Sequence, residues 1–95
     1  MITNSQRARL CDMAQQIKPI FQIGKGGITQ KEIIDISVAL DLHELVKISL
    51  KDATVDAKTF LIAICALTGA EQISANDNEV VIFRRSGGDI KHIEI

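Results

Sequence analysis

Ile20-Phe21-Gln22-Ile23-Gly24-Lys25-Gly26-Gly27-Ile28-Thr29 is the stretch of sequence that decides the fold. Its first four residues predict a short strand, and three glycines in the next four positions end that strand abruptly. Thr29-Gln30-Lys31-Glu32 then has the spacing of a capping box, in which two side chains accept backbone N–H groups at the start of a helix. The helix is expected to run to about His43, because its apolar residues keep helical spacing (Ile33, Ile36, Ala39 and Leu40).

Another helix is predicted before this stretch, over about residues 3–17. Thr3-Asn4-Ser5-Gln6 is a second capping box, and one apolar stripe follows it (Leu10, Met13, Ala14 and Ile17). Pro19 ends this helix, because its ring disfavours helical geometry in the residue before it.

The second half of the chain predicts a strand, a helix and two more strands. Residues 45–50 alternate between apolar and polar, and a helix over about 54–68 ends at Gly69, which suits a left-handed cap. Strands are expected at 71–75 and 79–84, around a tight turn at Asn76-Asp77-Asn78. The last strand is apolar on both faces, which favours a central position in the sheet. A turn at 86–89 and a weak strand or tail at 90–95 complete the chain.

The order of elements is α-β-α-β-α-β-β, and the fold class is therefore α/β. The two strand–helix–strand units are expected to be right-handed crossovers between parallel strands, and the final pair is expected to be a hairpin. The sheet is therefore mixed. The chain has 95 residues, which allows one domain over 1–95.

Composition excludes several classes of protein. The formal net charge is −1, so the chain is not a polycation, although the residues through Lys51 carry +2 and the remainder −3. An anionic partner should therefore meet a local patch, mostly in the first half. No apolar run is long enough for a membrane span, and the polar N-terminus does not resemble a secretory signal. We expect a cytoplasmic protein with reduced cysteines and no membrane partner.

The Gly24–Gly27 cluster is the most informative candidate site. Glycines let a ligand approach the backbone closely, and Lys25 with the free amides of the next helix would suit a phosphate or another anion. The cluster is neither a P-loop nor a dinucleotide fingerprint, whereas KH modules grip the nucleic-acid backbone with a Gly-x-x-Gly loop. Glycines between a strand and a helix also act as simple connectors, and the spacing alone does not separate the two roles.

Other basic residues become candidate phosphate contacts only if they converge on this loop, since each could also be ordinary surface charge (Lys18, Lys31, Lys47, Arg84 and Arg85). Nothing in the sequence predicts catalysis, a metal site, a cofactor or a small-molecule substrate. His43 follows a helix as a cap or surface residue, and His92 lies in the tail with no evident partner. The histidines and cysteines have no zinc-binding spacing.

Several segments together resemble one family. Residues 18–29, the stretch His43-Glu44-Leu45-Val46-Lys47-Ile48, and Thr68-Gly69-Ala70 with residues 80–84 are similar to the CRM domain, an RNA-splicing and ribosome-maturation module. Its bacterial stand-alone members are the YhbY-like proteins. The resemblance implies a two-layer α/β fold with a four-stranded mixed sheet, similar to the C-terminal domain of translation initiation factor three. It also implies RNA binding through the Gly24–Gly27 loop and neighbouring basic residues.

Two features of this chain depart from the family. This chain is slightly acidic where many relatives are basic, and its tail carries few basic residues.

Two functions are considered. The first is that of a non-enzymatic RNA-binding protein, which binds ribosomal RNA of the large-subunit precursor and assists assembly of the large ribosomal subunit. The alternative is a protein-interaction module that docks on a ribosomal protein or an assembly factor.

Overall fold

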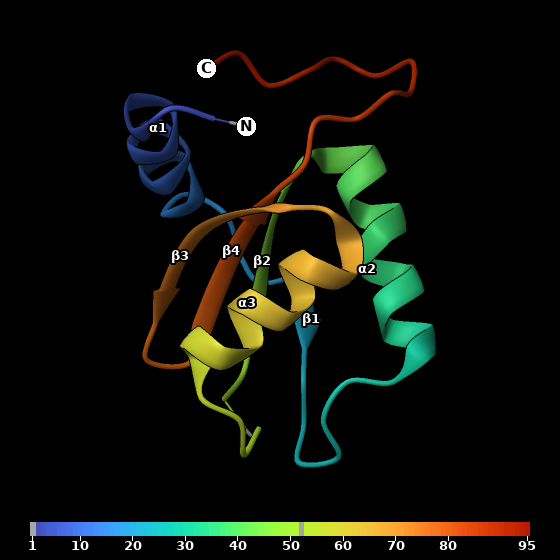
Figure 1. The fold of residues 1–95 in the computed structure, drawn as a ribbon. Helices are drawn as coiled ribbons and strands as arrows, with labels where there is room; N and C mark the ends of the chain where they lie inside the picture. The colour runs from blue at the N-terminus through green and yellow to red at the C-terminus, as the bar shows by residue number, and fades with distance from the viewer. Residues whose placement is uncertain (1, 52) are drawn as a thin grey trace.

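The computed structural model describes residues 2–51 and 53–95 and contains the predicted elements in the predicted order (Figure 1). In chain order the elements are α1 (Asn4–Ala14), β1 (Phe21–Gln22), α2 (Gln30–His43), β2 (Leu45–Ser49), α3 (Ala57–Thr68), β3 (Glu71–Asn76) and β4 (Glu79–Phe83). Among the described residues, no helix has both the length and the apolar character needed to cross a membrane.

The four strands form one mixed sheet in the order β1-β2-β4-β3. β1 is parallel to β2, and β4 is antiparallel to both β2 and β3. The strands β2 and β3 are therefore parallel to each other, with β4 inserted between them. The central position predicted for the last strand is confirmed.

Helices cover both faces of this sheet (Figure 1). α2 and α3 pack on one face over the larger core, which includes Val80 and Ile82 of β4. α1 packs on the other face, where Leu10 and Ala14 meet a smaller core that contains Val81 and Phe83 of β4 (the other buried members are Leu45 and Ile73). β4 is apolar on both sides because it contributes to both cores. The two expected layers are thus present, and α1 adds cover on the second face.

Local capping explains most of the helix boundaries. Both predicted capping boxes form, at Thr3 with Gln6 and at Thr29 with Glu32. α1 ends at Ala14 rather than at residue 17, because the next three amides bond to carbonyls only three residues back and tighten the chain into turns. α3 begins at Ala57 rather than at 54, because the Asp56 side chain accepts the Thr59 N–H and caps the helix there.

Turns and the tail also follow local chemistry. Gly69 caps α3 in the left-handed conformation as predicted, and Asp77 has a positive φ in the turn between β3 and β4. The C-terminal tail, residues 84–95, forms no strand and crosses the end of the molecule where α2 finishes (Figure 1). Ile93 and Ile95 of the tail pack against the smaller core, which anchors the tail to the α1 side.

Candidate nucleic-acid interface

The Gly24–Gly27 loop projects beyond the sheet between β1 and α2 (Figure 1). Its base is fixed to the sheet by the Ile23 N–H, which donates to the Ser49 carbonyl at 2.9 Å. The turn is closed by a 3.0 Å hydrogen bond from the Gly27 N–H to the Gly24 carbonyl. Lys25 and Gly26 are exposed at the tip. The loop is therefore a defined turn with a cation at its outermost point.

The protein's own packing does not require glycine along this loop. A Cβ added to Gly24, Gly26 or Gly27 would meet no atom within 4 Å. Only Gly27, with φ of 73°, has a backbone conformation that disfavours other residues. The other glycines leave open space around a polar backbone, which is the arrangement that lets an anionic ligand approach closely.

The predicted capping box occupies part of the hydrogen-bonding capacity of the α2 N-terminus. The Thr29 hydroxyl accepts the Glu32 N–H at 3.3 Å, and the Glu32 carboxylate accepts the Thr29 N–H at 3.0 Å. The first helical hydrogen bond runs from the Ile33 N–H to the Thr29 carbonyl, so the amides of Gln30 and Lys31 lie before it. Since Glu32 also places a negative charge at the helix N-terminus, attraction of an anion falls mainly to nearby lysines.

Two lysines gather at this end of the molecule. Lys25 at the loop tip and Lys31 in the first turn of α2 are both exposed. Within residues 2–51 and 53–95, neither side chain forms an ion pair. Their charges therefore remain available to solvent or to a ligand.

Lys18 and Lys47 lie on the α1 side of the sheet. Lys18 is exposed after α1, and Lys47 is half-buried on β2, with its Nζ atom 3.9 Å from a Glu79 carboxylate oxygen. Both lysines line the same cavity beside β1. They form a second basic group, separate from the loop tip.

Arg84 lies at the opposite end of the sheet, and its guanidinium forms hydrogen bonds within the protein. Its Nη1 donates to the Thr68 carbonyl at 2.6 Å, and its Nη2 donates to the Ser37 carbonyl at 2.8 Å and to Asp41 at 3.0 Å. These bonds tie the C-terminal end of α3 and the last turns of α2 to the end of β4. The predicted convergence of Arg84 on the loop therefore does not occur.

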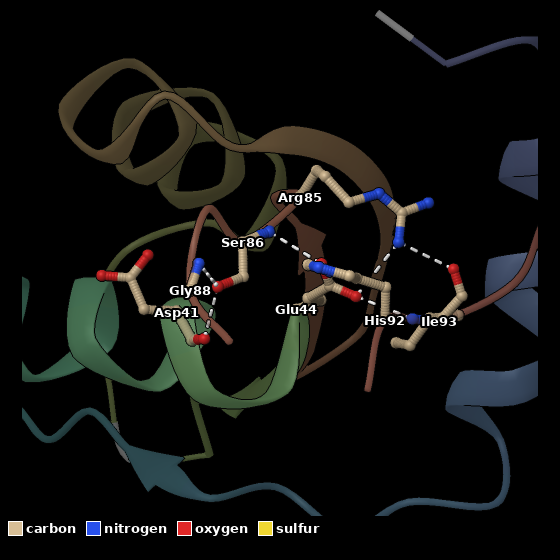
Figure 2. Close-up of polar contacts among 7 residues, drawn as sticks. All are labelled: Asp41, Glu44, Arg85, Ser86, Gly88, His92 and Ile93. Carbon is tan, nitrogen blue, oxygen red and sulfur yellow. Dashed lines mark hydrogen bonds and ion pairs between the residues drawn. The ribbon is translucent and has the colours of Figure 1, made fainter. Parts of the chain in front are cut away.

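Arg85 belongs to a polar group at the same end that surrounds one buried carboxylate, the Glu44 cluster, which comprises Glu44, Arg85, Ser86, His92 and Ile93 (Figure 2). Glu44 Oε1 accepts from Arg85 Nη1 at 3.1 Å and from the Ile93 N–H at 2.7 Å. Glu44 Oε2 accepts from the Ser86 N–H and from His92 Nδ1, both at 2.7 Å. Arg85 also donates to the Ile93 carbonyl, so the cluster fastens the tail.

The Glu44 carboxylate is completely buried and remains ionised. Burial alone would raise its pKa, but the hydrogen bonds from His92, Ile93 and Ser86, together with the charge of Arg85, lower the pKa to about 2. Sequence reasoning missed this cluster and left His92 without a partner. The one available signal was a carboxylate placed directly before an apolar strand, where an unpaired charge would be costly.

The described residues contain no group of three or more His, Cys, Asp or Glu side chains that could hold a metal ion. Both cysteines are free thiols. Burial, together with the negative charge of Glu71, raises the pKa of the Cys65 thiol to about 11, so this sulfur is not a ready nucleophile.

Comparison with known proteins identifies relatives over most of the chain. The model of the CRS1 / YhbY (CRM) domain matches residues 2–84. A Bacillus subtilis protein named "Probable RNA-binding protein YqeI" is 31% identical over 96 residues, covering 100% of this chain and 99% of its own. An "RNA-binding protein" from Haemophilus influenzae is 29% identical, covering 90% of this chain and 87% of its own. The solution structure of SAV1595 from Staphylococcus aureus is 31% identical, with a TM-score of 0.77 and 94% of each chain covered.

Proposed function

Because the chain belongs to the CRS1 / YhbY (CRM) domain family, we propose that it binds RNA through the Gly24–Gly27 loop. Relatives that match nearly the whole chain are named RNA-binding proteins, which supports RNA as the partner. The observation that carries the proposal is the exposed Lys25 on a glycine turn whose open space the protein's own packing does not use.

The loop would hold the sugar-phosphate backbone rather than read bases. Glycines at the tip allow a phosphate to approach the backbone, and Lys25 and Lys31 supply positive charge. Lys18 and Lys47 extend the positive surface along the other side of β1. Because the net charge of the whole chain is −1, attraction for RNA is confined to these local groups.

The cellular role we propose is assembly of the large ribosomal subunit, with precursor ribosomal RNA as the target. This role needs no catalytic group, since a bound protein can stabilise one RNA conformation through contacts alone. It rests on the family's association with ribosome maturation.

A second candidate function is docking on a ribosomal protein or an assembly factor. It is favoured by an apolar stripe on α2, where Ile34, Val38 and Leu42 are spaced four residues apart and are each more than half exposed (56%, 51% and 57%). Exposed apolar groups that lie together are typical of contact surfaces. Co-sedimentation with ribosomal particles before and after nuclease treatment separates the two functions, because a protein-docked chain would stay on the residual protein.

The loop is tested by Lys25→Ala, with Lys91→Ala as the matched control because Lys91 is an exposed lysine in the tail. RNA affinity is measured between 50 and 200 mM salt, values chosen because phosphate contacts make binding strongly salt-dependent over about this range. Lys25→Ala should weaken binding and flatten the log–log salt slope by about 0.7 on single-stranded RNA. Lys91→Ala should leave the slope unchanged. Equal affinities for the parent and Lys25→Ala at low salt would remove the loop from the mechanism.

A further inference from the structure

A cavity of about 320 Å³ lies on the α1 face of the sheet beside β1, and we name it the edge pocket. Its apolar lining comes from Met13 and Ile17 near the end of α1, from Ile20 before β1, and from Leu45 on β2. Pockets of roughly 300–1,000 Å³ with mostly apolar walls are typical of small-ligand sites. Ile20 is 50% exposed, so part of this apolar wall faces solvent.

The ionisable residues that line the edge pocket are all basic. Lys18, Lys47 and His43 line it, and the lining contains no Asp or Glu. Glu79 lies outside the lining and approaches the Lys47 ammonium only to 3.9 Å. Lys18 is exposed and forms no ion pair within the part of the chain that the structure describes. The pocket therefore joins an apolar floor to a positively charged rim.

An unpaired nucleotide has the complementary chemistry. Its base is a flat group that packs on apolar side chains or stacks on an imidazole, and its phosphate is an anion. We propose that the edge pocket receives one unpaired nucleotide of the bound RNA. The base packs on Ile20 and the apolar floor beside His43, and Lys18 holds the phosphate.

The edge pocket and the glycine loop lie along one segment of chain. Ile20 precedes Gly24 by four residues, about 13 Å of extended backbone. A single RNA strand of a few nucleotides can therefore contact the loop with its backbone and the pocket with one base. This inference rests on the proposed RNA binding and adds a preference for unpaired RNA, which phosphate contacts at the loop do not give.

One wall of the edge pocket comes from the tail. Ile93 lines the pocket, and its backbone N–H donates to the buried Glu44 carboxylate at 2.7 Å. The family model matches residues 2–84, so this wall lies beyond the segment that the model matches. The Glu44 cluster therefore fixes the position of one side of the proposed nucleotide site.

The experiment compares Ile20→Ala with Ile62→Ala. Ile62 is an isoleucine on α3 that has the same exposure as Ile20 (50%) and lies outside the pocket. Binding is measured for three RNA probes of equal length: a single strand, a duplex, and an abasic ribose-phosphate chain. Ile20→Ala should weaken binding of the single strand by about fivefold, because the substitution removes apolar atoms that would pack on the base. Binding of the duplex and the abasic chain should not change, and Ile62→Ala should match the parent on all three probes.

The outcomes separate this inference from the loop proposal. If Lys25→Ala weakens binding of all three probes while Ile20→Ala changes none, the loop stands and the nucleotide site is wrong. If Ile20→Ala selectively weakens the single strand while Lys25→Ala has no effect, the pocket stands and the loop fails. If Ile20→Ala weakens the abasic chain as much as the single strand, no base occupies the pocket and the inference is overturned. Equal melting temperatures of Ile20→Ala and Ile62→Ala exclude unfolding as the cause.

Discussion

The two ends of the sheet use polar groups in opposite ways. At the Gly24–Gly27 loop, Lys25 is exposed and forms no ion pair within residues 2–51 and 53–95. In the Glu44 cluster, one buried carboxylate accepts four hydrogen bonds from the protein itself. A basic residue is therefore a stronger candidate for RNA binding where its charge is exposed and unpaired than where the fold holds it in several hydrogen bonds.

The arginines make this contrast clear. Arg84 and Arg85 follow an apolar strand and look like an ordinary basic patch in the sequence. In the structure Arg84 donates to two backbone carbonyls, at Thr68 and Ser37, where the planar guanidinium suits several fixed acceptors at once. Arg85 faces Glu44. We therefore do not include either arginine in the proposed RNA surface.

The largest expected effect is a loss of stability when the Glu44 cluster is disrupted. Glu44→Ala removes the shared acceptor of four donors. Because a hydrogen bond to a charged group contributes about 1.5–3 kcal/mol, losing several of them should cost at least about 3 kcal/mol of unfolding free energy. Alanine keeps a side chain at the same φ of 65°, so the backbone strain is matched. Urea denaturation measures the loss, with the exposed Glu94→Ala as the control.

RNA binding by Glu44→Ala tests whether the two ends of the sheet act separately. If the two ends act separately, the folded fraction of Glu44→Ala should keep the salt slope of binding to a duplex RNA, which does not use the edge pocket, whereas Lys25→Ala changes that slope and leaves stability unchanged. A Glu44→Ala protein as stable as Glu94→Ala would show that the cluster does not hold the tail.

The next effect is a dependence of stability on pH. The Glu44 pKa is about 2 in the folded protein, against an ordinary value of 4.5. Because the folded pKa is lowered, the stabilisation is fully present above pH 4.5 and is lost as the pH falls from 4.5 towards 2. The difference between the two values corresponds to about 3 kcal/mol. Urea denaturation of the parent and Glu44→Gln between about pH 2 and 6, the range over which the stabilisation is lost, should show the two proteins converging as pH falls. A constant gap between them would contradict the prediction.

Local signals predicted the framework of the fold well. The capping boxes at Thr3 and Thr29 gave two helix starts, since each depends only on residues three positions apart. The two-sided apolar character of β4 gave its central place. The end of α1 and the start of α3 were misplaced by three residues each, because tight turns and the Asp56 cap outweighed the apolar pattern.

The candidate site was only partly predictable, for a physical reason. Lys25 and Lys31 lie close to the glycine turn in sequence, so their proximity follows from local geometry. The partners of the Arg84 and Glu44 side chains lie 41 to 49 positions away, apart from Thr68, and only the folded sheet brings them together. A sequence shows which residues are charged, whereas these distant partners determine whether a charged side chain is paired within the fold or free to bind a ligand.

The smallest expected effect separates two glycines within the loop itself. Gly27 has φ of 73°, whereas Gly26 has no positive φ, and a Cβ at either position meets open space. Gly27→Ala should lower the unfolding free energy by about 1 kcal/mol, because a left-handed backbone penalises any Cβ. Gly26→Ala should leave stability unchanged or slightly raised, because alanine restricts the unfolded chain. Thermal and urea denaturation measure both variants.

RNA binding by Gly26→Ala and Gly27→Ala then shows whether the glycines contact RNA or only form the turn. If the open space around Gly26 admits a phosphate, Gly26→Ala should weaken RNA binding without any loss of stability, because the added methyl group occupies the approach to the backbone. If Gly26→Ala binds RNA as tightly as the parent while Gly27→Ala loses only stability, the glycines serve the turn alone. The two ends of the sheet would then differ only in the exposed lysines near the loop, because the backbone at both ends would serve only to maintain the fold.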